Sequence, residues 1–314
     1  MRKKSSPLNL AAIKTTSLAK RPSKVSVRDC CTPHRKAGSF KAFLNSLPNT
    51  LAARDLKTIA RLIVRAHRGK KRIIFGMGAH VIKVGLSPLI IDLMRRGLLS
   101  CVALNGAGAI HDVEIALAGK TSEDVAARLA SGQFGMAAEA AELINRAVAV
   151  AQHENRGMGR AIGEALLNRR ASFNQMSILA EAARQGIPCT IHVSIGSDTI
   201  HMHPTFDGAA TGKASHNDFI TFADQVRHLS GGAYINIGSA VVLPEVFLKA
   251  FSMAANRGKA PRNLTTVNMD FIRHYRPSLN VVERPTLLQG KGFNLIGHHE
   301  IMLPLLAAAI LEKL

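Results

Sequence analysis

The segment from residue 72 to residue 80 reads Arg-Ile-Ile-Phe-Gly-Met-Gly-Ala-His. Its first four residues form a short apolar run that is typical of a buried strand, and its two glycines favour a turn. A helical pattern then runs through Leu86 to Arg96. The segment therefore predicts a strand, a glycine turn and a helix in succession.

The same unit recurs along the rest of the chain. Further apolar strands are expected at residues 100–104, 187–193, 233–237, 264–269 and 293–296. Helices are expected from near His111, from Val246 to Met253 and from about Glu300 to Glu312, with a helix-rich insertion at about 121–185. Strands that alternate with helices favour a parallel sheet covered on both faces. We therefore predict an α/β fold with a doubly wound, mostly parallel sheet of Rossmann-like topology and a helical insertion.

Most of the positive charge precedes this repeating part. The chain has 314 residues, with 41 Lys and Arg against 21 Asp and Glu, and a net charge of +20. The first 72 residues hold 19 of the basic and two of the acidic residues, a net +17, which leaves 22 and 19, a net +3, for the rest. Residues 1–36 show no sustained apolar period, so we expect a basic, flexible tail. Residues 37–314 are expected to form a single domain.

Two amphipathic helices are expected between this tail and the first strand, one over residues 40–47 and one over residues 51–66. The polar face of the second holds Arg54, Lys57, Arg61, Arg65 and Arg68. A solvated surface accounts for such a face more simply than a phosphate-binding stripe. No aromatic residues lie among these charges and the chain has no Trp, so nucleic-acid binding is disfavoured.

Composition excludes several classes of protein. A hydrophobic content of 47% rules out a wholly disordered chain. No uncharged apolar run reaches about 18 residues, as a transmembrane helix needs, and no apolar stretch follows the basic N-terminus as in a secretory signal. The four cysteines have no zinc-type spacing. We therefore expect a cytoplasmic protein without a membrane segment.

Glycine turns follow four of the expected strands, at residues 76–78, 105–108, 196–198 and 238–239. Such a turn lets backbone N–H groups approach a phosphate, and the N-terminus of the following helix adds partial positive charge. Ligands of open α/β sheets bind at this edge. The four turns together indicate a nucleotide site, although none completes a Gly-x-Gly-x-x-Gly pattern and no P-loop is present. Glycine also serves simply to close a turn, so both roles remain open.

Two groups of histidines could supply acid–base chemistry. His201 and His203 lie close to Asp198, and His298 and His299 are followed by Glu300. Imidazoles beside carboxylates suit either general acid–base catalysis or a metal site. No spaced ligand pair such as His-x-x-x-His fixes a metal shell, so polar residues that contact a substrate are the simpler interpretation.

The order and spacing of these motifs over about residues 73–312 resemble those of the deoxyhypusine synthase family. The family's Thr-Ser-Asn turn corresponds to Gly78-Ala79-His80, and its Thr-Ala-Gly-Gly turn corresponds to Asn105-Gly106-Ala107-Gly108, after which Asp112 falls on one of the family's acidic residues. Its Gly-Ser-Leu-Gly-Asp stretch is similar to Ile195-Gly196-Ser197-Asp198. Its Gly-Gly-Gly-Val-Val strand end and its Phe-Pro-Leu-Leu helix are similar to residues 238–242 and 303–306.

This resemblance implies a doubly wound domain that binds NAD and assembles as a homotetramer with sites between subunits. It would place Asp198 near the nicotinamide or the substrate. The residues that would bind NAD are Gly78, Ala79, His80, Asn105, Gly106, Ala107, Gly108, Asp112, Gly238 and Ser239.

The sequence departs from the family where the family's chemistry is done. After Val-Val the family has Lys-His-His, whereas this chain has Leu243-Pro244-Glu245. Pro285 stands where the family has the lysine that forms an imine with the substrate, and proline has no amine that could replace it. Lys291, six residues later, could be a displaced substitute or a solvent-facing lysine.

We therefore expect an NAD-dependent oxidoreductase or transferase that acts on an undetermined small molecule and is not a true deoxyhypusine synthase. Two alternatives remain: a metal-assisted hydrolase or lyase built on His201, His203, His298 and His299, and a non-catalytic binding protein whose basic arm contacts a partner. A homo-oligomer is expected from the resemblance. The expected catalytic residues are Asp198, His201, His203, His299 and Glu300.

Overall fold

The computed structural model describes residues 7–314 and is built on one six-stranded sheet. All neighbouring strands are parallel, and their order is β3-β2-β1-β4-β5-β6. The predicted doubly wound α/β fold is therefore confirmed, with the strand order typical of dinucleotide-binding domains. The strands are β1 (Ile73–Met77), β2 (Cys101–Asn105), β3 (Cys189–His192), β4 (Ala233–Ile237), β5 (Thr265–Asp270) and β6 (Lys291–Ile296).

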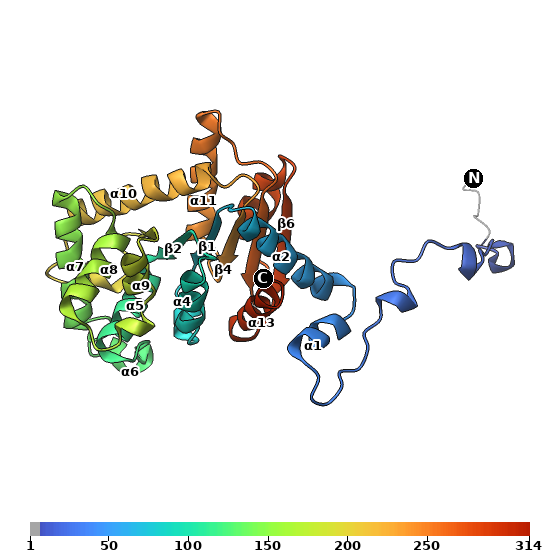
Figure 1. Ribbon diagram of the computed structural model, residues 1–314, viewed down its shortest axis with the longest axis horizontal. Coiled ribbons are helices and arrows are strands. Elements are labelled where there is room, and N and C mark those ends of the chain that lie inside the picture. Colours follow the sequence, from blue (N-terminus) through green and yellow to red (C-terminus); the bar gives the residue numbers. More distant parts are fainter. Residues whose placement is uncertain (1–6) are drawn as a thin grey trace, which may run out of the picture.

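Helices cover both faces of this sheet (Figure 1). One face packs against α2 (Leu51–Arg68), α4 (Ser87–Arg95), α5 (Gly106–Ala118) and α13 (His299–Leu311), through side chains such as Ile63, Ile90 and Leu306. The other face packs against α10 (Gly208–Arg227) and α11 (Val242–Asn256), and here Tyr234 stacks on Phe247 at a centroid distance of 3.8 Å. Strands buried on both faces explain their nearly continuous apolar sequence.

Several element boundaries differ from the sequence prediction, and three of the differences have a clear physical reason. Strand β6 begins at Lys291, before residue 293, because its exposed first residues carry no apolar signal. Helix α5 begins at Gly106, five residues before His111, because the side chain of Asn105 caps it by accepting from Gly108 N. The helical pattern after β1 is divided into α3 (His80–Lys83) and α4, because Gly85 adopts the left-handed region with φ +79°.

The insertion between β2 and β3 contains α6 (Val125–Leu129), α7 (Ala138–His153), α8 (Met158–Arg169) and α9 (Ile178–Gln185), which lie together at one side of the molecule (Figure 1). The buried carboxylate of Asp218, on α10, fastens this part to the sheet. It accepts from Gly159 N at the start of α8 and from Ile191 N of β3, both at 2.9 Å. Helix α8 therefore has its N-terminal cap supplied by another helix.

The N-terminal segment leads away from this body (Figure 1). Residues 7–39 contain three short 3-10 turns and are almost entirely exposed, and α1 (Phe40–Ser46) then precedes α2. Residues 1–6 of the expected tail lie outside the described residues. Among the helices of residues 7–314, none has the length and apolar character needed to cross a membrane.

Candidate functional site

The carboxyl ends of all six strands lie at one edge of the sheet because the strands are parallel. From β1 the chain first adds strands on one side, β2 and β3, and then returns to add β4, β5 and β6 on the other side. Open α/β sheets bind their ligands in the crevice at this switch point, between β1 and β4. The glycine turns, Asp198, His80 and His299 all follow strands at this edge. The sequence therefore predicted the edge of the sheet that holds the candidate site.

The turns after β1 and β4 touch each other. Gly78 N donates to Ile237 O at 2.9 Å, and a Cβ atom on Gly78 would lie 2.1 Å from Gly238 O. Gly238 has φ +63°, and a Cβ there would lie 2.9 Å from Cε1 of His299. Both glycines are therefore required by close packing, and they bring two backbone turns against the His299 ring.

Histidine and phenylalanine rings gather beside these turns. The ring centroids of His80 and His299 are 5.4 Å apart, and Phe271 lies 5.9 Å from His80 and 6.0 Å from His299. His298 also stacks on Phe271, with ring centroids 6.4 Å apart. The rings follow β1, β5 and β6, so they lie along the part of the edge from β1 to β6.

His299 is arranged as a neutral base. Its Nε2 lies 3.3 Å from Met269 O, and because a carbonyl oxygen only accepts, Nε2 carries the proton. Its Nδ1 is buried and finds no hydrogen-bond partner among the described residues. Burial lowers the pKa of His299, an effect partly opposed by the Met269 carbonyl and by Asp270, whose Oδ1 is 4.0 Å from Nε2. The lone pair of Nδ1 is therefore unoccupied within residues 7–314.

A second acid–base group lies on the other half of the edge. Asp198 is 8% exposed, and its Oδ2 has no hydrogen-bond partner in the described chain and lies 4.0 Å from Nε2 of His201. Gly196 N donates to Nδ1 of His201 at 3.1 Å, which turns Nε2 towards the carboxylate. Burial raises the pKa of Asp198 and lowers that of His201. The two shifts bring the proton affinities of the carboxylate and the imidazole closer together, which suits the exchange of a proton between them.

Asp198 also fills the N-terminus of α5. A Cβ atom on Gly106 would lie 2.0 Å from Asp198 Oδ2, and a hydrogen bond from the backbone of Ala107 lowers the pKa of Asp198 against the larger effect of burial. Gly108 N is already bonded to the side chain of Asn105. Because the chain supplies its own anion here, a phosphate at residues 105–108 requires Asp198 to move away.

A cavity of about 240 Å³ adjoins Asp198 and is lined by residues that the sequence reasoning missed, among them Lys83, His111 and Glu114. His111 Nδ1 lies 2.6 Å from Oγ1 of Thr121 and 3.3 Å from Oε2 of Glu114. The signal available in the sequence was the pair His111 and Glu114, three residues apart on one helix face.

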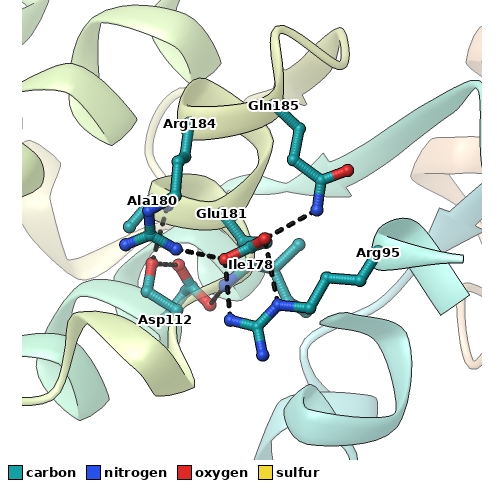
Figure 2. A network of polar contacts seen from close by, with 8 residues as sticks. Arg95, Asp112, Ile178, Ala180, Glu181, Arg184 and Gln185 are labelled. Carbon is teal, nitrogen blue, oxygen red and sulfur yellow. Dashed lines mark hydrogen bonds and ion pairs between the residues drawn. The ribbon is translucent and has the colours of Figure 1, made fainter. Parts of the chain in front are cut away.

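Asp112, expected near the cofactor, has a structural role (Figure 2). Its buried carboxylate accepts from Ser177 Oγ at 2.5 Å, Ile178 N at 2.8 Å and Leu179 N at 3.1 Å, and so caps α9. Burial raises its pKa to about 6 against these three hydrogen bonds. On the same helix, Glu181 binds Arg95 of α4, so the region joins helices and does not face the turns.

The structure does not bring the expected histidines together, which corrects the four-histidine metal site. His201 and His203 follow β3, while His298 and His299 follow β6, and these are the two edge strands. Five spacings of about 4.8 Å place the strands about 24 Å apart. Within residues 7–314, no group of three or more His, Cys, Asp or Glu could hold a metal ion.

The remaining expected residues are peripheral. His203 Nε2 lies 2.8 Å from Gly135 O, and Glu300 is exposed in the first turn of α13. Lys291, considered as a substitute for the family's lysine, is exposed at the amino end of β6, the opposite end of the strand from the glycine turns. Pro285 is buried in a 3-10 turn. Neither position 285 nor Lys291 therefore places an amine at the glycine turns.

No protein-family model matches the chain, and no curated protein matches it. Among solved structures, a conserved LOR/SDH protein from Methanococcus maripaludis S2 has a TM-score of 0.53 and 18% identity over 84% of this chain and 71% of its own. The ternary complex of AgrE with ornithine and NAD+ has a TM-score of 0.53 and 14% identity; the match covers 82% of this chain but only 33% of the AgrE chain. A protein from Entamoeba histolytica that is described as a deoxyhypusine synthase has a TM-score of 0.51 and 10% identity. The match covers 88% of this chain and 94% of the Entamoeba chain. These likenesses establish a related α/β fold.

Proposed function

We propose that the protein is an NAD-dependent oxidoreductase or transferase that acts on a small molecule at the carboxyl edge of its sheet. The observation that carries the proposal is the neutral His299, with a free Nδ1, held against the glycine turns where the strand order reverses. The solved complex of AgrE with ornithine and NAD+ supports a nucleotide role for this fold. The resemblance to deoxyhypusine synthase adds a preference for a homo-oligomer in the cytoplasm.

The three glycine turns expected to bind NAD are not equally available to it. The turns at Gly78–His80 and Gly238–Ser239 lie against each other where the strand order reverses, so they are the proposed cofactor contacts. The turn at residues 105–108 joins them only when Asp198 withdraws. When bound, NAD supplies the capacity to accept a hydride. This chain's own contribution is the removal of the accompanying proton, by His299 Nδ1 or by the pair of Asp198 and His201.

Replacement of the family's lysine by Pro285 argues against deoxyhypusine formation. A covalent imine needs a desolvated amine at the site, and Lys291 lies at the other end of its strand. The proposed chemistry is therefore acid–base assistance to a redox step without a covalent lysine intermediate.

Titration calorimetry of the full chain with NAD+ and NADH tests the proposal. We expect saturable binding of one of the two at one site per chain. In His299→Gln the new side chain can still donate to Met269 O, so we expect this variant to retain binding of the cofactor. The matched change His298→Gln replaces an exposed ring and is the control. Absence of binding of both cofactors at millimolar concentration, with the protein folded by circular dichroism, would overturn the proposal.

A further inference from the structure

The opposite edge of the sheet holds a second cavity, of about 670 Å³. It lies at the amino ends of β4, β5 and β6, between the last turn of α2 and the turns that precede those strands. Because strands are parallel, this cavity is separated from the glycine turns by the full length of the sheet. It is therefore a different site from the one proposed for NAD.

The cavity is lined by four cationic side chains, Arg65, Lys71, Arg262 and Lys291, and by no Asp or Glu. None of the four side chains makes a hydrogen bond or an ion pair with any residue from 7 to 314. Elsewhere in the same protein, exposed arginines are matched to carboxylates, as Arg95 is to Glu181. Four unmatched cations around one concave surface concentrate positive potential there.

Backbone contacts fix the turns that carry these cations. Gly231 N donates to Arg262 O at 2.9 Å, Asn263 N donates to Leu288 O at 3.2 Å, and Lys291 N donates to Leu264 O at 2.8 Å. Asn263 has φ +53°, an uncommon conformation for a residue with a side chain. The turns before β4, β5 and β6 are thus tied to one another, and the cations project from a fixed frame.

The cations come from separate elements. Gly231 has φ +72°, and a Cβ placed there would lie 3.6 Å from Cε of Lys71, so the aliphatic part of Lys71 lies beside Gly231. Arg65 belongs to α2, Arg262 precedes β5, and Lys291 begins β6.

We infer that this cavity binds the di- or triphosphate group of a small molecule. Guanidinium groups bind phosphate oxygens in pairs and lysines add point charges, so four cations match a chain of phosphates better than a single one. The volume is in the range of small-molecule sites. No aromatic side chain lines the cavity to stack on a base, which favours a small ligand over nucleic acid.

The test uses the full chain and calorimetry with tripolyphosphate, pyrophosphate and inorganic phosphate in a buffer without phosphate. We expect tripolyphosphate to bind most tightly, with an affinity that falls steeply as salt is added. Arg262→Gln and Lys291→Gln should each weaken binding about fivefold or more. The control Lys14→Gln/Lys20→Gln removes the same kind of charge from the N-terminal arm and should leave binding within about twofold.

Three results would overturn the inference: no binding of tripolyphosphate to the folded protein, an equal loss in the arm variant, or an equal affinity for inorganic phosphate. Adenosine triphosphate distinguishes a nucleotide from free polyphosphate as the source of the phosphates, according to which binds more tightly. Measurement of NAD binding by the same variants distinguishes this cavity from the site proposed for NAD. We expect Arg262→Gln to leave NAD affinity unchanged, so failure at one edge of the sheet leaves the other proposal standing.

Discussion

The carboxylate of Asp198 lies so close to Gly106 that one additional carbon would overlap it, at 2.0 Å from Oδ2. This relationship joins the loop after β3 to the start of α5. It makes a glycine necessary at a position where a helix would otherwise favour alanine. The same contact holds the candidate acid of the site in place.

Gly106→Ala is expected to displace Asp198 and lower the free energy of unfolding by about 1–3 kcal/mol, as overpacking does. Urea denaturation measures the change. Gly212→Ala is the matched control, since a Cβ there meets nothing within 4 Å on α10. It should be neutral or stabilise the protein by up to about 1 kcal/mol. Equal effects of the two substitutions would contradict the contact.

The buried carboxylate of Asp218 should make stability depend on pH. Burial raises its pKa to about 7 against the hydrogen bonds it accepts, so the folded state holds a proton that the unfolded state releases near pH 4. Its contribution is therefore present below about pH 4 and is lost as the pH rises through about 7. Asp218→Asn should flatten this loss, and urea denaturation at pH 5 and pH 8 measures it. The control Asp224→Asn changes a half-exposed carboxylate of the same helix and should retain the wild-type dependence.

The sheet could be predicted from the sequence because β1 to β5 are buried almost throughout, so that most of them have a nearly uninterrupted apolar signal, as at residues 233–237. The strand at Lys291 was placed too late for the opposite reason: it forms an edge, and its first residues are exposed. The start of α5 was missed because its cap, Asn105, was read as part of a ligand turn.

The candidate site was predictable only by its edge. The rule for parallel sheets places Asp198, His80 and His299 at the carboxyl ends, but spacing along the chain does not tell which histidines meet. His203 and His298 were both expected at one site, yet they follow β3 and β6, the two outermost strands of the sheet. The role of Asp112 as a cap for α9 depends on Ser177, 65 residues away, which local patterns do not reveal.

We expect His299 to remain neutral down to a more acidic pH than an ordinary histidine does, with its proton on Nε2. The pKa of this group is lowered chiefly by burial, so its charged form appears only at a more acidic pH than for an ordinary histidine. Nitrogen-15 spectra of the histidine rings measure both the tautomer and the titration, with the signal assigned by its loss in His299→Gln. The exposed His298 ring is the internal comparison. A ring that becomes charged at the pH of an ordinary histidine or above, or a proton on Nδ1, would exclude the proposed base.

Incubation of the protein with NAD+, spermidine and an acceptor protein should leave the acceptor lysine unmodified. The physical reason is that Pro285 has no amine and Lys291 is exposed at the far end of β6. Mass spectrometry of the acceptor provides the measurement, with a known deoxyhypusine synthase as the positive control. Appearance of deoxyhypusine would show that another residue forms the imine.

The strand order has a consequence for the way the chain is made. Strand β1 pairs with β4, so Ile73 meets Ala233 across 160 positions of sequence. During synthesis from the N-terminus, β1, β2 and β3 are complete long before β4 leaves the ribosome, and the apolar edge at residues 73–77 waits without a partner. Long-range parallel strand pairs of this kind form slowly, and the intermediates that precede them are prone to aggregate. Fragments that end before residue 233 should therefore aggregate, and the yield of the full chain should depend on chaperones and on the rate of translation.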